Sequence, residues 1–299
     1  MAEAEVGEQG EVVEGGQRVE GHGQGTVSDA AGRDDPPTVA PVPQIGEDEI
    51  RELGRRHLPK KAVESLLELA LPSLALETRP ARPGLGHESR LGGRPKVAPE
   101  FSWPATEGRP LYLLTVLQLA ALAPEDPTGL LPKRGYLDLF FDVGAPDLPT
   151  GLCPAQAFHV EHSDVEIFEE RPTPAGAEQY PAVAVEPANQ LSLPHHREPE
   201  VAELAERYGS KLRRFHDEYI EAAGVPRHRM FGWPDLVDGP MHAALPKYRG
   251  ATWQLLAQLD SDDELDWSWG NVGRLYLWVP RSDLRKARFD RCQMVLQTY

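Results

Sequence analysis

In the part of the chain expected to fold, acidic residues are densest between positions 260 and 266. The cluster consists of Asp260, Asp262, Asp263, Glu264 and Asp266. Oxygen ligands of this kind bind hard cations such as Ca²⁺, and grouped carboxylates also serve in hydrolytic catalysis. An EF-hand is excluded, because its sixth and twelfth positions would hold Leu265 and Asn271 in place of Gly and Glu. Three interpretations stay open: a solvated loop whose Asp side chains bond backbone amides, a metal site, and a catalytic site.

Tryptophan is concentrated in the same region, with five of the six residues at positions 233, 253, 267, 269 and 278. Trp253 and Trp278 fall on predicted strands and are expected in the core. Trp267 and Trp269 fall in a turn, where we expect them to be exposed. Exposed aromatic rings beside acids and an amide are typical of a groove that binds a sugar or a peptide. The predicted binding residues are Asp260, Asp262, Asp263, Trp267, Trp269 and Asn271.

Two groups of histidines have residue types that could bind a metal ion. His159 and Glu161 would share one face of a predicted strand, while His162 would point away from them. Two ligands do not make a transition-metal site, and the pair His195-His196 could supply a third, although nothing in the sequence requires it. We therefore predict no metal and no cofactor.

Motifs for covalent catalysis and nucleotide binding are absent from the sequence. It contains no GxSxG elbow, Walker A motif or GxGxxG run. Cys153 precedes a proline in a predicted loop, and Cys292 alternates with apolar residues in a predicted strand. Neither cysteine is accompanied by a paired histidine motif, so no catalytic residue is predicted.

The pattern of apolar residues, glycines and prolines predicts where the regular elements lie. Strands are predicted over 74–78, 111–119, 136–143, 157–162, 252–259, 275–280 and 292–299, and irregular extended structure over the proline-rich residues 164–197. Helices are predicted over 47–58, 60–70, 198–223 and 282–287. Strands in quick succession, with helices set apart, predict an α+β protein with a mainly antiparallel sheet.

Three short motifs occur twice in the same order. LGGRP, LTVLQLA and GYLDLFF between residues 91 and 141 match MFGWP, QLLAQLD and GRLYLWV between residues 230 and 279. Gly93 aligns with Gly232, Gln118 with Gln258, and Gly135 with Gly273, at offsets of 139, 140 and 138 residues. An internal duplication is predicted, with halves at about residues 90–165 and 228–299 and a helical connector at 198–223; chance similarity is the alternative.

Charge is unevenly distributed along the 299 residues, whose net charge is −16. Residues 1–46 carry nine acids and two bases but few large apolar groups, and are expected to be a disordered acidic tail before a domain at 47–299. The remainder is mildly acidic, which argues against binding to nucleic acid or an anionic membrane. With two cysteines, no secretory signal and no apolar run long enough to span a bilayer, the chain is expected to be cytoplasmic.

Several motifs in the C-terminal part resemble those of a known family. They are His228-x-x-x-Gly232-x-Pro234, the segment 253–260, Asp262-Asp263, Trp269-Gly270-Asn271-x-Gly273, the segment 275–278, Phe289-Asp290 and the closing residues 296–299. Together they resemble the YwqG-like family, a bacterial domain family of uncharacterised function, over roughly residues 60–299. The family typically has Trp-Gly-Asp where this chain has Asn271, which keeps a hydrogen-bonding group but loses the charge.

The leading functional hypothesis is a non-enzymatic cytoplasmic module that binds a protein or a small-molecule ligand. It rests on the lack of a complete catalytic constellation and on the acidic, tryptophan-rich segment. The alternative is a metal-dependent or hydrolytic enzyme that uses the carboxylates of Asp260, Asp262 or Asp263. Convergence of these carboxylates in a cleft would favour the enzyme.

Overall fold

The computed structural model describes residues 45–79, 88–143, 151–153, 155–160, 169–224, 227–247 and 252–299. Residues Val39–Tyr299 form one compact unit. Nearly all of the predicted acidic tail lies outside the described residues. The side chain of His159 and the whole of Glu161 and His162 also lie outside them, so the expected pairing there stays a prediction.

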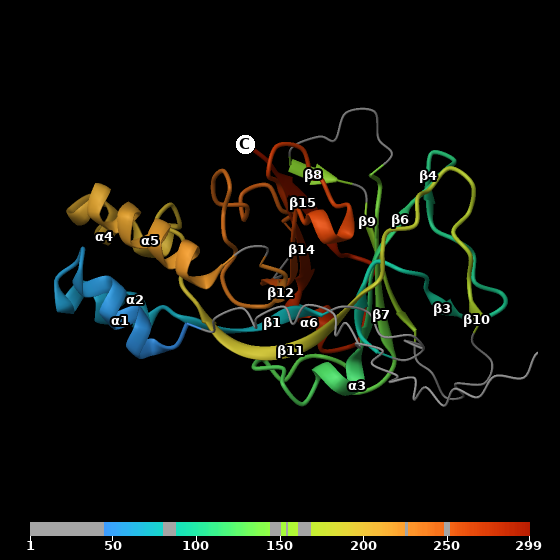
Figure 1. The fold of residues 1–299 in the computed structure, drawn as a ribbon, viewed down its shortest axis with the longest axis horizontal. Helices are drawn as coiled ribbons and strands as arrows, with labels where there is room; N and C mark the ends of the chain where they lie inside the picture. Colours follow the sequence, from blue (N-terminus) through green and yellow to red (C-terminus); the bar gives the residue numbers. More distant parts are fainter. Residues whose placement is uncertain are drawn as a thin grey trace, which may run out of the picture. The chain divides into compact units, whose positions relative to one another are not determined.

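One antiparallel sheet of eleven strands dominates the described residues (Figure 1). Its order is β8 (Gly151–Cys153), β15 (Gln293–Gln297), β14 (Arg274–Pro280), β13 (Trp253–Asp260), β12 (Arg229–Met230), β1 (Leu71–Arg79), β11 (Val183–Ser192), β2 (Arg90–Leu91), β6 (Tyr112–Gln118), β7 (Tyr136–Phe141) and β9 (Ala155–Val160). The two end strands, β8 and β9, are neighbours along the chain, and the sheet is accordingly nearly closed, like a barrel. The predicted antiparallel sheet is confirmed.

Two small ribbons accompany the main sheet. β3 (Lys96–Val97) pairs with β10 (Glu169–Glu170), and β4 (Ala105–Thr106) pairs with β5 (Arg109–Pro110).

The central strands are buried on both faces, which explains their almost continuous apolar sequences. Along β14, Leu275, Leu277 and Val279 enter the main core, while the alternating Tyr276 and Trp278 pack in a smaller cluster on the other face. β7 alternates in the same way between the main core and a cluster covered by Phe101 and Trp103. Because side chains alternate along a strand, such sequences lose the polar–apolar pattern of half-exposed strands.

β11 was not predicted, because residues 164–197 contain many prolines. Nine of its ten residues, 184–192, pair with β1, and Pro187 lies opposite Leu76. β2 pairs only with Val183 and Ala184. Pro187 therefore lies where, among the described residues, β1 is the only ladder partner, a position that tolerates a residue without a backbone N–H.

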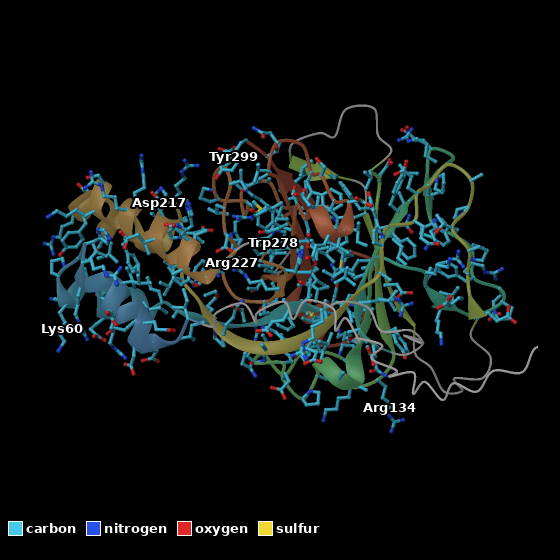
Figure 2. The ribbon with its side chains drawn as sticks, viewed as in Figure 1. Lys60, Arg134, Asp217, Arg227, Trp278 and Tyr299 are labelled. Atoms are coloured by element: carbon cyan, nitrogen blue, oxygen red, sulfur yellow. The ribbon has the colours of Figure 1, made fainter. Side chains whose placement is uncertain are left out.

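Four helices form a cluster beside the ends of β1 and β11 (Figure 1). These are α1 (Glu47–Arg55), α2 (Lys60–Glu68), α4 (Ala202–Tyr208) and α5 (Ser210–Ala223), whose apolar faces share one core. Charged residues such as Lys60 and Asp217 extend outward (Figure 2). The helix predicted over 198–223 is divided, because Gly209 has φ 44° and ψ −112°. No helix among the described residues is both long and apolar enough to cross a membrane.

Short helical segments complete the fold. They are α3 (Leu119–Leu122), α6 (Arg281–Leu284) and the 3₁₀ turns Pro199–Val201 and Asp263–Leu265. The predicted helix at 282–287 is confirmed in position, but it is only one turn long.

The predicted repeat halves share two structural features, a register shift and a glycine turn. The β6–β7 ladder shifts register between Leu113 and Thr115, and the β13–β14 ladder shifts between Leu255 and Ala257. The aligned glycines also share a left-handed backbone, since φ is 79° at Gly93 and 73° at Gly232. The origin of these likenesses in a duplication stays a prediction.

We expect Gly232→Ala to destabilise the fold. A Cβ there would overlap Ser192 Oγ and lie 2.7 Å from Ser73 Cβ, and the positive φ adds strain of roughly 1–3 kcal/mol. Urea unfolding should show the loss. Gly239→Ala is the control, because a Cβ at that position meets nothing within 4 Å. Equal stability of the two variants would contradict the close packing of the Gly232 turn.

Candidate functional site

The predicted carboxylates do not converge. Asp260 is 4% exposed and forms an ion pair with Arg274 (Oδ1 to Nε, 3.1 Å). Asp262 is 7% exposed and contacts His228 Nε2 at 3.0 Å, while its other oxygen accepts a hydrogen bond from the backbone of Glu264. Asp263 is exposed. Two of the three carboxylates are therefore buried with separate partners, and the third is exposed.

The expectation that Trp267 and Trp269 are exposed was wrong. They are 2% and 0% exposed, and their rings lie 5.3 Å apart in the main core. Reciprocal backbone hydrogen bonds between Asp262 and Trp267 (both 2.9 Å) fold the segment back on itself. This turn brings both indoles against Tyr180, at ring distances of 6.0 and 6.4 Å.

Asn271 remains at the surface, where its backbone oxygen accepts hydrogen bonds from Thr298 Oγ1 and Tyr299 N. The six predicted binding residues are therefore divided between the core, buried ion pairs and the surface. They do not form one binding face.

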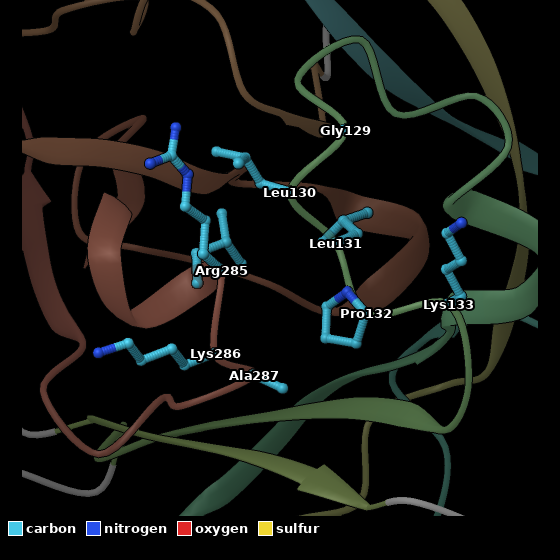
Figure 3. Close-up of a pocket in the computed structure, with 9 residues that line it drawn as sticks. Gly129, Leu130, Leu131, Pro132, Lys133, Arg285, Lys286 and Ala287 are labelled. Carbon is cyan, nitrogen blue, oxygen red and sulfur yellow. The ribbon is translucent and has the colours of Figure 1, made fainter.

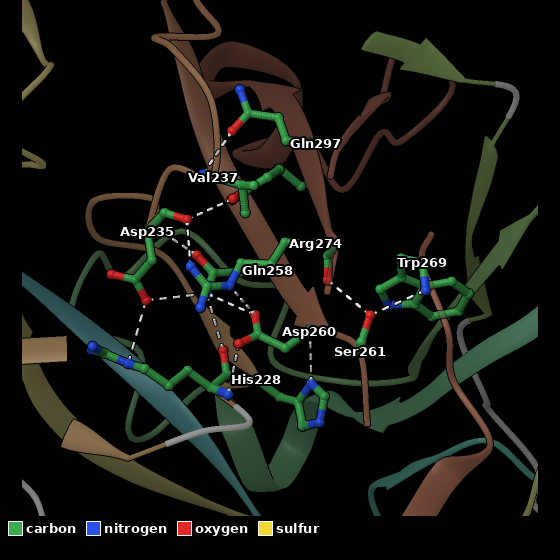
Figure 4. A network of polar contacts seen from close by, with 12 residues as sticks. His228, Asp235, Val237, Gln258, Asp260, Ser261, Trp269, Arg274 and Gln297 are labelled. Atoms are coloured by element: carbon green, nitrogen blue, oxygen red, sulfur yellow. Dashed lines mark hydrogen bonds and ion pairs between the residues drawn. The ribbon is translucent and has the colours of Figure 1, made fainter. Parts of the chain in front are cut away.

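A buried polar network occupies the place where a carboxylate site was expected (Figure 4). Asp235 is its centre: one carboxylate oxygen contacts Arg229 Nη1 at 2.6 Å and Arg227 Nε at 3.3 Å. Gln258 donates to the same oxygen at 3.2 Å and to Asp260 at 3.0 Å. Although burial raises the pKa of Asp235, the surrounding arginines lower it well below its usual value.

The network also ties neighbouring strands together. The backbone oxygen of Asp235 accepts hydrogen bonds from the Tyr276 hydroxyl at 2.6 Å and from Arg274 Nη1 at 2.9 Å. Gln297 holds the following residues, since its Oε1 accepts from the backbone N–H of Val237 at 3.0 Å. The network thus fixes the segment after β12 on β13, β14 and β15.

A different group of side chains has ligand-like spacing. His195, His196 and His216 each offer one ring nitrogen, and these three nitrogens lie within 4.8 Å of one another. Among the described residues, this is the group of three His, Cys, Asp or Glu side chains that could hold a metal ion. The sequence suggested His195-His196 as possible ligands but did not associate them with His216.

Two segments position these histidines. His195 and His196 follow β11, where the chain passes from the sheet to the helices and Leu193 is already buried in the helical core. His216 lies on the inward face of α5, one turn after Leu212 and one turn before Tyr219. This spacing was the available signal for a buried His216, because it places the ring among the apolar residues of the helix.

The rings are close together and poorly supplied with hydrogen bonds. The centroid of His195 lies 4.1 Å from that of His196 and 4.4 Å from that of His216. Both nitrogens of His196 and Nε2 of His216 are buried without a hydrogen-bond partner. Burying such atoms unpaired is costly, so a ligand that engages them would remove a penalty present in the free protein.

The three histidines are neutral at physiological pH. Burial lowers the pKa of His195 to about 2 and that of His216 to about 3, and it also lowers the pKa of His196. Neighbouring positive groups, including Arg197 beside His195, lower these pKa values further. Neutral imidazoles keep a lone pair for a metal, and nitrogen donors suit Zn²⁺, Cu²⁺ and Ni²⁺.

His195 would lose one hydrogen bond on binding a metal through either ring nitrogen. Its Nδ1 accepts a hydrogen bond from the backbone N–H of Arg197 at 3.2 Å, so the proton of the neutral ring is on Nε2. Binding a metal through Nε2 would move the proton to Nδ1 and displace this contact. The contact is long and neutral, so its loss costs only about 0.5–1.5 kcal/mol.

Glu198 is the carboxyl without a hydrogen-bond partner that lies closest in sequence to His195 and His196. Both oxygens are buried without a hydrogen-bond partner, and burial raises its pKa to about 7. It is not a member of the histidine group.

Most of the chain matches the model of one protein family. A family model described as "Domain of unknown function (DUF1963)" matches residues 89–298, which include all three histidines and the Asp235 network. No curated protein matches the chain. The expectation of an uncharacterised domain is confirmed, and the YwqG-like assignment stays a prediction.

We expect Trp269→Ala to lower the free energy of unfolding by about 3–5 kcal/mol, because it empties a fully buried aromatic site. Asn271→Ala is the matched surface control and should change stability by no more than about 0.5 kcal/mol. Denaturant unfolding measures both. A small effect of Trp269→Ala would contradict its place in the core.

The low pKa of His216 predicts a specific pH dependence. Between about pH 6.5 and 5, the unfolded chain gains a proton at this residue and the folded chain does not, so folding loses about 1.4 kcal/mol per pH unit. The charged residues that act on His216 are Asp235, which raises its pKa, and Arg227 and Arg274, which lower it, while His195 and His196 are its titratable neighbours. His216→Phe should therefore gain stability relative to the wild type as pH falls through this window.

The two proteins should be compared by urea unfolding at several pH values. The difference between them isolates His216 from other groups such as Glu198, whose raised pKa acts in the opposite direction. A difference that stays constant between pH 7 and 5 would contradict a neutral, buried His216.

Proposed function

This chain belongs to the DUF1963 domain family, and from its own geometry we propose that it is a non-enzymatic binding module for a transition-metal ion. The ion is held by His195, His196 and His216. The observation that carries the proposal is the trio of neutral imidazoles, two buried and one half-buried, with ligand atoms within 4.8 Å of one another and with unpartnered nitrogens on His196 and His216. Metal–nitrogen bonds of about 2.0–2.1 Å would draw the rings slightly closer together.

The ligands join two parts of the fold. His195 and His196 belong to the segment that leaves β11, whereas His216 belongs to α5. A bound ion therefore cross-links the sheet to the helical cluster. It adds stability only to the folded state, because the unfolded chain does not hold the three rings together.

The surroundings of the site favour binding over catalysis. Asp235 is the carboxylate that acts on the charge of His195 and His216, and it is engaged by Arg227 and Arg229. The carboxylates of Asp260 and Asp262 are likewise paired. Among these groups no general base is held ready beside the histidines, and Glu198, which has no hydrogen-bond partner, is not a member of the histidine group.

The proposal has two further parts. The halves of the sheet descend from a duplicated unit, supported by their matched glycine turns and by one register shift in each hairpin ladder. The protein acts in the cytoplasm, supported by two cysteines that are both free.

Metal binding should raise the thermal stability of the full chain. Zn²⁺ at about 100 times its Kd should add about 2.7 kcal/mol to the free energy of unfolding. Because the imidazoles are already neutral, binding at pH 7 should release close to zero protons. Calorimetry in buffers of different ionisation enthalpy measures the affinity and the proton count together.

His216→Leu and His196→Leu should each weaken binding by at least about tenfold, and the exposed His242→Leu is the control. The Co²⁺ protein should show a visible spectrum of nitrogen ligation that is lost in His216→Leu. Absence of saturable binding, or equal affinity in all variants, would overturn the proposal.

A further inference from the structure

Exposed cations line a surface hollow of about 420 Å³ between residues 129–133 and 284–287 (Figure 3). The charged ends of Lys133, Arg285 and Lys286 point away from one another there, so they do not converge on a common ligand. The buried Arg227 differs from them, because two of its nitrogens are held together at one place and lack hydrogen-bond acceptors.

Arg227 lies between α5 and β12, where the helical cluster meets the sheet (Figure 2). Its backbone is fixed, because its N–H donates to Asp260 Oδ2 at 3.1 Å and its carbonyl oxygen accepts from Gln258 Nε2 at 3.2 Å. Its side chain is 3% exposed, and its Nε lies 3.3 Å from Asp235 Oδ2. Although burial lowers the pKa of Arg227, Asp235 and Tyr219 raise it, so the guanidinium stays charged.

The two outer nitrogens of this guanidinium have no acceptor. Nη1 and Nη2 are both buried without a hydrogen-bond partner. The guanidinium carbon lies over the ring of Tyr219, 5.3 Å from its centroid, and the ring attracts the charge through its π face. The Tyr219 hydroxyl donates to the backbone oxygen of Leu191 at 3.0 Å. Unmet donors on a buried charge are costly, so a ligand that accepts from them would remove a penalty.

The histidine group lies beside this guanidinium. Tyr219 is close to both, because its ring lies 5.3 Å from the guanidinium carbon and 6.1 Å from the ring of His216, one turn earlier on α5. Burial is the main cause of the low pKa of His216, and Arg227 is near enough to lower it further. Nε2 of His216 is also buried without a partner. Unpartnered nitrogens of both residues therefore occur in one region, where α5 meets the sheet.

Positive charge predominates around the histidines. Asp235, which acts on His195 and His216, is itself held by three arginines. The charged residues that act on the three histidines include Arg197, Arg213, Arg227 and Arg274, opposed by Asp217 and Asp235. A divalent ion adds two further positive charges, and a bound anion would offset them.

We propose that Arg227 binds a small inorganic oxyanion beside the histidines, and that this anion is a co-ligand of the metal ion. Because Asp235 engages Nε, the remaining fork consists of Nη1 and Nη2, whose N–H groups match two oxygens of an oxyanion. A sulfate-like or phosphate-like anion keeps a further oxygen for the metal. The role as co-ligand rests on the proposed metal site, whereas the anion site at Arg227 does not.

Sulfate is a suitable probe, because its charge does not change near neutral pH. Calorimetry of the metal-free full chain should show saturable sulfate binding with a Kd of about 1 mM or tighter. Sodium chloride at equal ionic strength is the reference, since a single-atom anion does not offer separate oxygens to the two nitrogens. No saturation by sulfate, or equal binding of chloride, would overturn the proposal.

Arg227→Lys keeps the charge near Asp235 but replaces the fork by one nitrogen. It should weaken sulfate binding by at least about tenfold. Arg274→Lys is the matched control, because Arg274 belongs to the same network but its Nη1 and Nε already contact Asp235 and Asp260. Its sulfate affinity should stay close to that of the wild type. Equal weakening in both variants would refute the assignment to Arg227, because it would indicate a general disturbance of the network.

Crystals of the wild-type chain grown with selenate test the position of the anion even where Arg227→Lys fails to fold. Selenate has the shape and charge of sulfate and scatters anomalously. We expect an anomalous peak beside Nη1 and Nη2 of Arg227. Peaks at the surface alone would indicate an adventitious ion only and would contradict the proposal.

Metal and anion should bind cooperatively to the full chain. Sulfate should raise the affinity for Co²⁺ by at least about fivefold, and Co²⁺ should raise the affinity for sulfate by the same factor. A Co²⁺ affinity that sulfate leaves unchanged would overturn the role as co-ligand. Absence of Co²⁺ binding would instead contradict the proposed metal function, and the titration of the metal-free chain then decides the anion site alone.

Discussion

Asp235 makes the interaction on which the C-terminal half of the sheet depends. Its carboxylate is buried between Arg227 and Arg229, and its backbone oxygen accepts bonds from β14. A buried charge without partners costs several kcal/mol, so these groups must be assembled together or not at all. Gln258 joins this assembly by donating hydrogen bonds to Asp235 and Asp260. These contacts fix β12, β13 and β14 against one another.

This constraint decides which polar residues remain available for chemistry. Asp260 and Asp262 belong to a segment with the composition of a ligand cluster, but their carboxylates are engaged by Arg274 and His228. The same folding of the segment places Trp267 and Trp269 in the core. The many polar residues in this part of the sequence form a buried network. The side chains that remain available for chemistry lie at the borders of the sheet.

The candidate histidine site lies where segments distant in sequence meet, because His195 and His196 follow β11 and His216 belongs to α5. Side-chain nitrogens of His196 and His216 are left there without protein partners. Fixed backbone with unsatisfied side chains is the condition in which a ligand gains most from binding.

The sequence by itself determined the local features of this protein. Continuous apolar runs bounded by Gly and Pro predicted β6, β7, β13 and β14, because these patterns depend on neighbouring residues alone. The tertiary structure decided the rest. β11 needed its partner β1 to accommodate Pro187, Trp269 needed the core to receive it, and His216 met His195 only through the packing of α5. Burial and convergence arise from contacts between distant segments, and residue spacing along the chain carries no direct record of them.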